Sequence, residues 1–364
     1  MTLRISMAVL AAVLLAGTAA ACTSDSGDHG GTWVAPGKGQ AAQLLDFSDG
    51  GRDAKVRGVA FYGFDQFSNG MTTGPDGSTY VLGQKLVRLK RDRTVSTVPL
   101  DLGKDGEARG IVALPDNSLV FGSDGQVKKV GPQGSETVLA GVSGRYRTSG
   151  RPVPASAPAT GVHFTKSVSP FGVGPDGTVL IADQDVLWAL KDGTVRRLYQ
   201  VTAESAQGLP LGLDSDNAVD AKGTAYLSPE TYSPEDDGTL GDVVSVGPDG
   251  RLGKPLLPTT KIDGLPGNPA AYRVRWLTGD GSDGLFAHVY DPSGNNGAIV
   301  HLHSGTAELI AHEKPGIEVG KPCSLARPVD ALHLPCVLPQ AMVYRSGSLV
   351  LGGTAEYVLQ IRVA

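Results

Sequence analysis

The sequence predicts an all-β protein built from a repeated four-stranded unit, and three observations support this. The chain of 364 residues contains 50 glycines and 24 prolines, which lie between short apolar runs. Pro-Asp-Gly and Asp-Gly sequences recur between those runs, where glycine tolerates positive φ and proline presets the first turn position. One unit aligns in six copies along the chain. Repetition of four antiparallel strands is typical of the blades of a β-propeller.

The six copies share one order of strands and turns. In the first copy a strand meets the turn Pro75-Asp76-Gly77, and the strands Ser78–Leu82 and Leu86–Leu89 follow. A second turn then leads to a fourth strand. The spacing predicts about six blades, with five or seven as alternatives because the interval between turns is uneven. The copies are Gly70–Val98, Gly110–Gly141 and Phe171–Gln200, followed by three that begin at Asn217, Val274 and Gln340.

The last copy is incomplete in a way that predicts how the ring closes. It stops after its third strand, Tyr357–Arg362. The apolar segment Ala42–Phe47 could supply the missing fourth strand from the other end of the domain. Such pairing hides sheet edges that would otherwise pair with other chains. We therefore expect one propeller domain over residues 41–364.

The first 21 residues have the features of a secretory signal peptide. Arg4 precedes an apolar run over about residues 7–16, and small residues follow it. That run is shorter than the roughly 20 residues that span a bilayer. The alternative is a signal anchor that is retained.

Cys22 directly follows three alanines, and this arrangement resembles the lipobox of bacterial lipoproteins. The resemblance implies that Cys22 carries a diacylglyceryl group and anchors the chain to the outer face of the bacterial cytoplasmic membrane. The alternative is ordinary cleavage without lipid. Residues 22–40 are rich in Ser, Gly and Asp, so we expect a flexible tether.

The chain has three cysteines, and Cys323 and Cys336 remain if Cys22 carries lipid. An even pair in an oxidising compartment predicts a disulfide. Two isolated thiolates are too few for a closed zinc site, which takes four ligands.

The stretch 138–183, VLAGVSGRYRTSGRPVPASAPATGVHFTKSVSPFGVGPDGTVLIAD, resembles the NHL repeat. The resemblance implies a propeller that serves as a recognition scaffold. The matching residues are Ala140, Gly141, Gly144, Gly150, Pro154, Ala155, Ala157, Pro170, Gly172, Pro175, Asp176, Gly177, Ile181, Ala182 and Asp183. Residues 142–161 also carry Arg145, Arg147 and Arg151, which could dock an anionic partner or be surface arginines of a connection.

Propeller ligands usually bind at the mouth of the central channel, on loops that lead into the innermost strands. The candidate residues there are Asn69, Arg109, Asp214, Asp216, Asn217, Arg275 and Gln340. Asp216 and Asn217 offer the oxygen ligands that calcium takes, so calcium is a possible cofactor of this group. The alternative is that they cap a turn.

His288, His301 and His303 form a second candidate group. If the intervening turn centres on residues 293–296, His288 falls opposite His301, and His303 shares their face because side chains alternate along a strand. Three imidazoles could then bind a transition metal. The alternative is a partly buried structural cluster.

The formal net charge is −5, and the absence of a basic block disfavours nucleic acid as a partner. No serine-hydrolase, zinc-protease or phosphate-loop motif appears in the sequence. We therefore expect a monomeric, non-catalytic binding or scaffold propeller for a protein, peptide or glycan, in contact with the membrane only through its lipid. The alternative is a calcium-dependent lactonase or hydrolase, or a lyase of propeller type.

Overall fold

The structure is a computed structural model. It describes residues 33–47, 51, 53, 70–83, 85–100, 108–201, 217–228, 239–253, 261–294, 296–303, 305–317, 323, 325–353 and 357–364. The predicted signal peptide (1–21), Cys22 and most of the predicted tether lie outside these residues.

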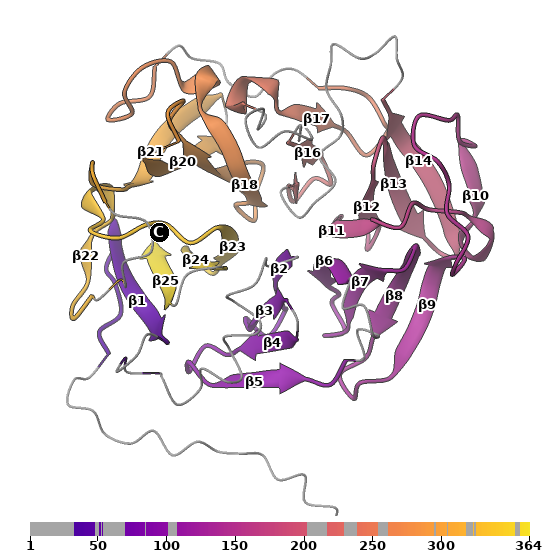
Figure 1. The fold of residues 1–364 in the computed structure, drawn as a ribbon, viewed down its shortest axis with the longest axis horizontal. Helices are drawn as coiled ribbons and strands as arrows, with labels where there is room; N and C mark the ends of the chain where they lie inside the picture. Colours follow the sequence, from indigo (N-terminus) through magenta and orange to yellow (C-terminus); the bar gives the residue numbers. More distant parts are fainter. Residues whose placement is uncertain are drawn as a thin grey trace, which may run out of the picture.

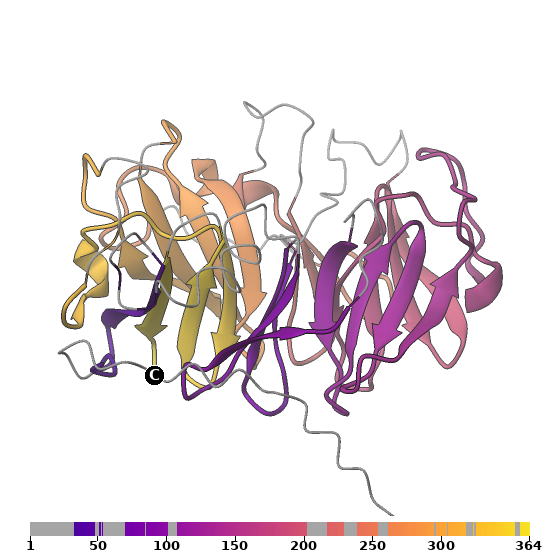
Figure 2. The ribbon, with the colours of Figure 1, turned by 60° about the horizontal axis from the view of Figure 1, so that its bottom comes forward.

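Six antiparallel sheets stand around a common centre, and each is one blade of a propeller (Figure 1). The turned view in Figure 2 shows the blades standing side by side in a disc. The predicted all-β propeller of about six blades is confirmed.

The first three blades follow chain order from residue 70. The first has β2 (Gly70–Thr73), β3 (Thr79–Leu82), β4 (Leu86–Leu89) and β5 (Val95–Val98). The second has β6 (Ala108–Ala113), β7 (Leu119–Ser123), β8 (Gln126–Val130) and β9 (Glu136–Gly141). The third has β11 (Ser169–Val173), β12 (Val179–Asp183), β13 (Val186–Lys191) and β14 (Thr194–Gln200), with β10 (Ser156–Pro158) added outside β14.

The remaining blades complete the ring. The fourth has β15 (Ala218–Val219), β16 (Ala225–Leu227) and β17 (Val244–Val246), and a single bridge from Val246 to Leu252 continues it outward. The fifth has β18 (Arg273–Gly279), β19 (Leu285–Tyr290), β20 (Gly297–His303) and β21 (Thr306–His312). The sixth has β23 (Ala341–Arg345), β24 (Ser348–Gly352), β25 (Tyr357–Arg362), β1 (Gln40–Asp46) and β22 (Val329–Asp330).

Helical structure among the described residues consists of four short 3-10 turns: η2 (Ala159–Gly161), η3 (Leu240–Asp242), η4 (Pro269–Ala271) and η5 (Ala331–His333). In this part of the chain, no helix has the length and apolar character needed to cross a membrane.

The ring closes where the sequence predicts. β1 pairs antiparallel with β25, with Ala41 opposite Ile361 and Asp46 opposite Tyr357. Figure 1 shows this indigo strand lying beside the yellow C-terminal strands. β22 pairs with the other edge of β1, with Gln40 opposite Asp330.

The core lies between neighbouring blades. All five residues of β12 and of β24 are buried, so these central strands show no alternation of buried and exposed positions. A continuous short apolar run is expected for a strand covered on both faces. Phe121, Phe164 and Trp188 are among the largest side chains that are fully buried.

Two glycines let the innermost strands approach closely. Gly110 has φ +56°, and a Cβ there would lie 2.2 Å from the Pro170 carbonyl oxygen of the next blade. A Cβ at Gly172 would lie 2.4 Å from Val219 Cγ1. The narrow ring of inner strands thus depends on positions that have no side chain.

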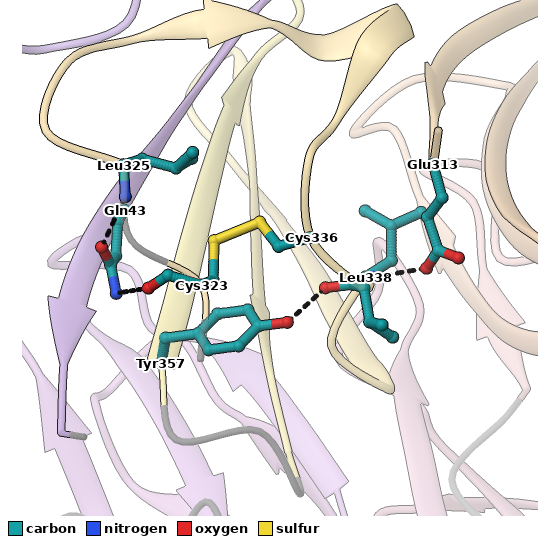
Figure 3. Close-up of a disulfide and its surroundings, with 8 residues drawn as sticks. Gln43, Glu313, Cys323, Leu325, Cys336, Leu338 and Tyr357 are labelled. Carbon is teal, nitrogen blue, oxygen red and sulfur yellow. Dashed lines mark hydrogen bonds between the residues drawn. A yellow bond between two sulfur atoms is a disulfide. The ribbon is translucent and has the colours of Figure 1, made fainter. Parts of the chain in front are cut away.

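The predicted disulfide between Cys323 and Cys336 is present (Figure 3). The Gln43 amide on β1 donates to the Cys323 carbonyl oxygen at 2.7 Å and accepts from the Leu325 backbone N–H at 3.1 Å. The Tyr357 hydroxyl donates to the Val337 carbonyl oxygen at 2.5 Å. The disulfide loop is therefore fastened to both strands that close the ring.

A buried ion network holds the connection that precedes the third blade. Arg147 Nε donates to Asp183 Oδ2 and its Nη1 to Asp185 Oδ1, both at 2.7 Å. Asp183 is fully buried and also accepts from the Thr165 hydroxyl at 2.6 Å and from Trp188 Nε1 at 3.2 Å. Arg147 is thus a structural residue rather than a surface arginine, and Asp183 is the last residue of the NHL-like stretch.

Replacing both Cys323 and Cys336 by serine should lower the free energy of unfolding by about 3 kcal/mol, because the unfolded chain then loses a cross-link that closes a short loop. Urea unfolding at pH 7.5 measures this, with Cys22→Ser as the matched control expected to leave stability unchanged. A loss below about 1 kcal/mol would show that the loop holds the seam without the disulfide.

Arg147→Met should lower the free energy of unfolding by about 3–5 kcal/mol, because it leaves the carboxylates of Asp183 and Asp185 buried without their cation. Arg145→Met removes an exposed arginine two residues away and should change stability by no more than about 0.5 kcal/mol. Equal effects of the two substitutions in urea unfolding would contradict the structural role of Arg147.

Candidate functional site

The innermost strands of the six blades surround a central channel with a volume of about 310 Å³. This volume is at the lower end of the range for small-ligand pockets, about 300–1,000 Å³. The strands are β2, β6, β11, β15, β18 and β23. The partly exposed residues on the channel wall include Thr72, Thr73, Ala113, Phe171, Val173, Thr278 and Tyr344.

Hydroxyl groups on the wall tie one blade to the next. The Thr73 hydroxyl donates to the Tyr344 carbonyl oxygen at 3.1 Å, across the boundary between the first and sixth blades. Thr72 Oγ1 accepts from the Ala113 backbone N–H of the second blade at 3.3 Å. These bonds fix the shape of the wall before any ligand arrives.

The structure describes four of the seven residues predicted at the channel mouth: Arg109, Asn217, Arg275 and Gln340. Arg109 and Arg275 lie near the starts of β6 and β18, and Asn217 and Gln340 directly precede β15 and β23. All four are therefore at the end where the innermost strands begin, but of the four only Asn217 is among the residues that line the channel. Asn69, Asp214 and Asp216 lie outside the described residues.

Arg275 and Gln340 form a polar pair that joins the fifth and sixth blades at the end where β18 and β23 begin. With the amide oriented as the guanidinium requires, Gln340 Oε1 accepts from Arg275 Nε at 2.9 Å and from Nη2 at 2.6 Å. The backbone carbonyl oxygen of Gln340 lies 3.3 Å from His288 Nδ1 behind the pair. The structure thus brings together two of the predicted mouth residues.

The described part of the channel wall places one carboxylate on its surface, that of Asp220. Its Oδ1 accepts from the backbone N–H groups of Lys222 and Thr224, and its Oδ2 from the Tyr226 hydroxyl at 3.2 Å. Asn217 Oδ1 accepts from the Ser228 N–H at 3.1 Å. Asp220 therefore caps the turn of the fourth blade, whereas Asn217 bonds the end of the neighbouring strand and does not cap a turn.

Asp220 belongs to a set of five aspartates that occupy the turn between the first and second strands of five blades. We call them the turn aspartates: Asp76, Asp116, Asp176, Asp220 and Asp280. In each, Oδ1 accepts from the backbone N–H two residues later, at 2.7–3.1 Å. This is the hydrogen bond of an Asx turn.

In the first three blades the turn aspartate also pairs with a cation on the third strand. Asp76 pairs with Arg88, Asp116 with Lys129, and Asp176 with Lys191. In the fifth blade His301 takes that position on β20, and its Nε2 lies 2.9 Å from Asp280 Oδ2. Burial raises the pKa of Asp280, but hydrogen bonds from His301 and Ser282 outweigh burial and hold it below the usual value.

The three predicted histidines do not converge. The ladder places Phe286, not His288, opposite His301, and His288 lies opposite Ile299. His301 and His303 are stacked with ring centroids 4.4 Å apart, and Glu308 on β21 is directly opposite His301. His288 is fully buried, and its Nε2 has no hydrogen-bond partner among the described residues. The residues that lie together on this face are therefore His301, His303 and Glu308, and not the three predicted histidines.

Sequence reasoning missed Asp280 and Glu308. Asp280 begins the turn of its blade, two residues before the position that Asp76 takes in the first blade, so alignment of the repeats does not point to it. Glu308 follows His303 by five residues across a tight turn, and pairing outward from that turn would have placed it opposite His301.

No family model and no curated protein matches the chain. Among solved structures, a protein of unknown function from Bacteroides thetaiotaomicron is similar with a TM-score of 0.53 and 10% identity, over 88% of this chain and 75% of that chain. The calcium-binding protein regucalcin from Agrobacterium tumefaciens gives a TM-score of 0.47 and 12% identity, over 82% of this chain and 90% of that chain. A gluconolactonase from Xanthomonas campestris gives a TM-score of 0.47 and 13% identity, over 91% and 98%. At these identities the likeness concerns the fold alone.

His288 should make the protein less stable in acid. Burial is the main cause that lowers the pKa of its imidazole to about 4; the hydrogen bond to Gln340 opposes this, and the nearby Arg275 adds to it. The unfolded chain, with a histidine pKa of about 6.5, therefore binds more protons between pH 6.5 and 4, and the free energy of unfolding falls as pH falls through this range.

Between pH 7.5 and 4.5 the wild-type chain should lose about 2–3 kcal/mol more than His288→Gln, which cannot titrate there. Urea unfolding at the two pH values gives this difference. Identical losses would mean that His288 becomes protonated in the folded protein without cost.

Proposed function

We propose that this chain is a non-catalytic binding propeller that holds a peptide segment of a partner protein, or a glycan, at the mouth of its channel. The chain works outside the cytoplasm and is tied to the outer face of the membrane by a lipid on Cys22. The proposal for its location rests on the signal-like residues 1–21 and the lipobox-like sequence before Cys22.

The observation that carries the proposed activity is the chemistry of the channel wall. The described wall offers hydroxyl groups, backbone and apolar side chains, and its one carboxylate is engaged by its own turn and by Tyr226. A nucleophile needs a neighbouring base, and a calcium site needs several free oxygen ligands. The described wall offers groups that can contact a ligand in a channel whose shape is fixed by bonds between blades. These are the properties that binding without catalysis requires.

The Arg275–Gln340 pair supports the proposed class of ligand. Its guanidinium donates hydrogen bonds and its amide can donate and accept them, at the end where β18 and β23 begin. Peptide carbonyl groups and sugar hydroxyls are complementary to such groups. Because the pair bridges two blades that the ring closure holds in place, a ligand would meet it in one orientation, which lowers the entropic cost of binding.

We expect peptide and glycan arrays probed with the chain to show saturable binding by one of the two classes, confirmed by calorimetry on the strongest members. Thr278→Arg should weaken that binding at least tenfold, because the partly exposed Thr278 lies on the channel wall and arginine would fill the channel. Thr278→Val keeps the volume of the side chain and is the matched control.

A calcium titration of the same chain separates this proposal from the enzyme alternative. We expect no tight, stoichiometric binding and no calcium-dependent hydrolysis of gluconolactone. Tight binding that Asp216→Ala and Asn217→Ala abolish, together with lactone turnover, would overturn the proposal in favour of the hydrolase.

A further inference from the structure

The outer half of the fifth blade gathers two imidazoles and a carboxylate on one face of a hairpin. His301 and His303 are two residues apart on β20, so their side chains leave the same face of the strand. Glu308 on β21 is directly opposite His301 in the ladder, which places it on that face as well. Each of the three can offer one ligand atom, and these atoms all lie within 4.8 Å of one another.

One pair of these atoms already has the spacing of two ligands on one ion. His301 Nδ1 and Glu308 Oε1 are 3.3 Å apart. Tetrahedral ligands at metal bond lengths of about 2.0–2.1 Å are separated by about 3.3–3.4 Å. The ligand atom of His303 lies within 4.8 Å of both, and its ring stacks on that of His301.

Asp280 positions the imidazole of His301. Its Oδ2 lies 2.9 Å from Nε2, which keeps the proton on that nitrogen and leaves the lone pair of Nδ1 directed toward Glu308. Asp280 is itself held by the backbone N–H groups of Ser282 and Gly284. Phe286 stacks on the His301 ring at 4.3 Å. A carboxylate that orients a ligating histidine through its other nitrogen is a recurrent feature of metal sites.

Comparison with the other blades shows that the second carboxylate is particular to this one. Arg88 and Lys129 pair with the turn aspartates of their blades, and the residues opposite them in the ladder are Ser96 and Thr137. In the fifth blade the cation is replaced by a histidine, and the residue opposite it is Glu308. A structural pair with Asp280 requires neither His303 nor Glu308.

We propose that His301, His303 and Glu308 bind a divalent transition metal ion of the zinc class, with Asp280 as the residue that orients His301. Two imidazoles and one carboxylate suit zinc and its neighbours rather than calcium, which takes oxygen ligands. The Glu308 side chain is 60% exposed and that of His301 16%, so an ion can reach the site from solvent. Three protein ligands leave a fourth position for water.

His288 is outside this site because it is buried and bonded to the Gln340 carbonyl oxygen. The residues of the site do not line the channel, and the site would bind a metal ion rather than a peptide or glycan. A zinc titration that shows no binding would therefore contradict the metal site alone. Loss of peptide or glycan binding would contradict the proposed recognition function alone.

The test is a titration of the full chain with zinc chloride alone, by calorimetry at pH 7.5 in a buffer that does not chelate zinc. We expect one zinc ion per chain. His301→Gln, His303→Gln and Glu308→Gln should each weaken binding on the order of 100-fold, and Asp280→Asn by about 10–100-fold. His163→Gln, which alters an exposed histidine elsewhere, and Cys22→Ser should leave binding unchanged.

His301→Lys is the decisive variant. Lysine can form an ion pair with Asp280, as Lys129 does with Asp116 from the same strand position, so the fold should keep its stability in urea while zinc binding is lost. Absence of stoichiometric binding by the wild-type chain would overturn the proposal. Retention of binding in His301→Lys or His303→Gln would overturn it as well.

Discussion

The pairing of β1 with β25 is the constraint on which the rest of the structure depends. Each blade is covered on both faces by its neighbours, so the central strands are buried only if the ring is complete. The sixth blade gains its fourth strand from the other end of the domain. The same seam carries the disulfide loop, whose backbone is bound by Gln43 on β1 and by Tyr357 on β25. Polar contacts and a covalent bond therefore concentrate where strands from the two ends of the described domain pair.

Much of this fold could be predicted because its signals are local. The turn Pro75-Asp76-Gly77 and its counterparts give the ends of neighbouring strands, and β4 and β25 have the predicted bounds. The missing strand in the last repeat likewise predicted the closure. The added strands β10 and β22 were not predicted, because two or three residues are too few to show a period. The buried role of Arg147 was also invisible, since its carboxylate partners lie 36 and 38 residues away in sequence.

The histidine prediction shows where local reasoning loses precision. The sequence places the turn after β19 one residue too far along the chain, which shifts the register of β19 against β20 by two residues. A shift of two keeps every side chain on its face, whereas a shift of one would reverse them all. The prediction that the three histidines share a face is therefore compatible with the structure. The prediction that His288 lies opposite His301 is wrong, because Phe286 takes that place. The contact between Arg275 and Gln340 joins different blades, and no spacing within a repeat encodes it.

The turn aspartates explain why a departure from the repeat is informative in this molecule. Their carboxylates hold the turn in five blades, and three of them take a lysine or arginine as a second partner. In that arrangement the carboxylate accepts the hydrogen bond of the turn and its charge is paired with a cation. A further polar residue on the fourth strand is then not required. Where His301 stands in place of the cation, the partner of the aspartate is an imidazole, which has a second ring nitrogen. Glu308 lies at that nitrogen, and His303 stacks beside it. The fifth blade therefore departs from the first two at the position where the turn aspartate meets its partner on the third strand, and this departure places an imidazole nitrogen beside a second carboxylate.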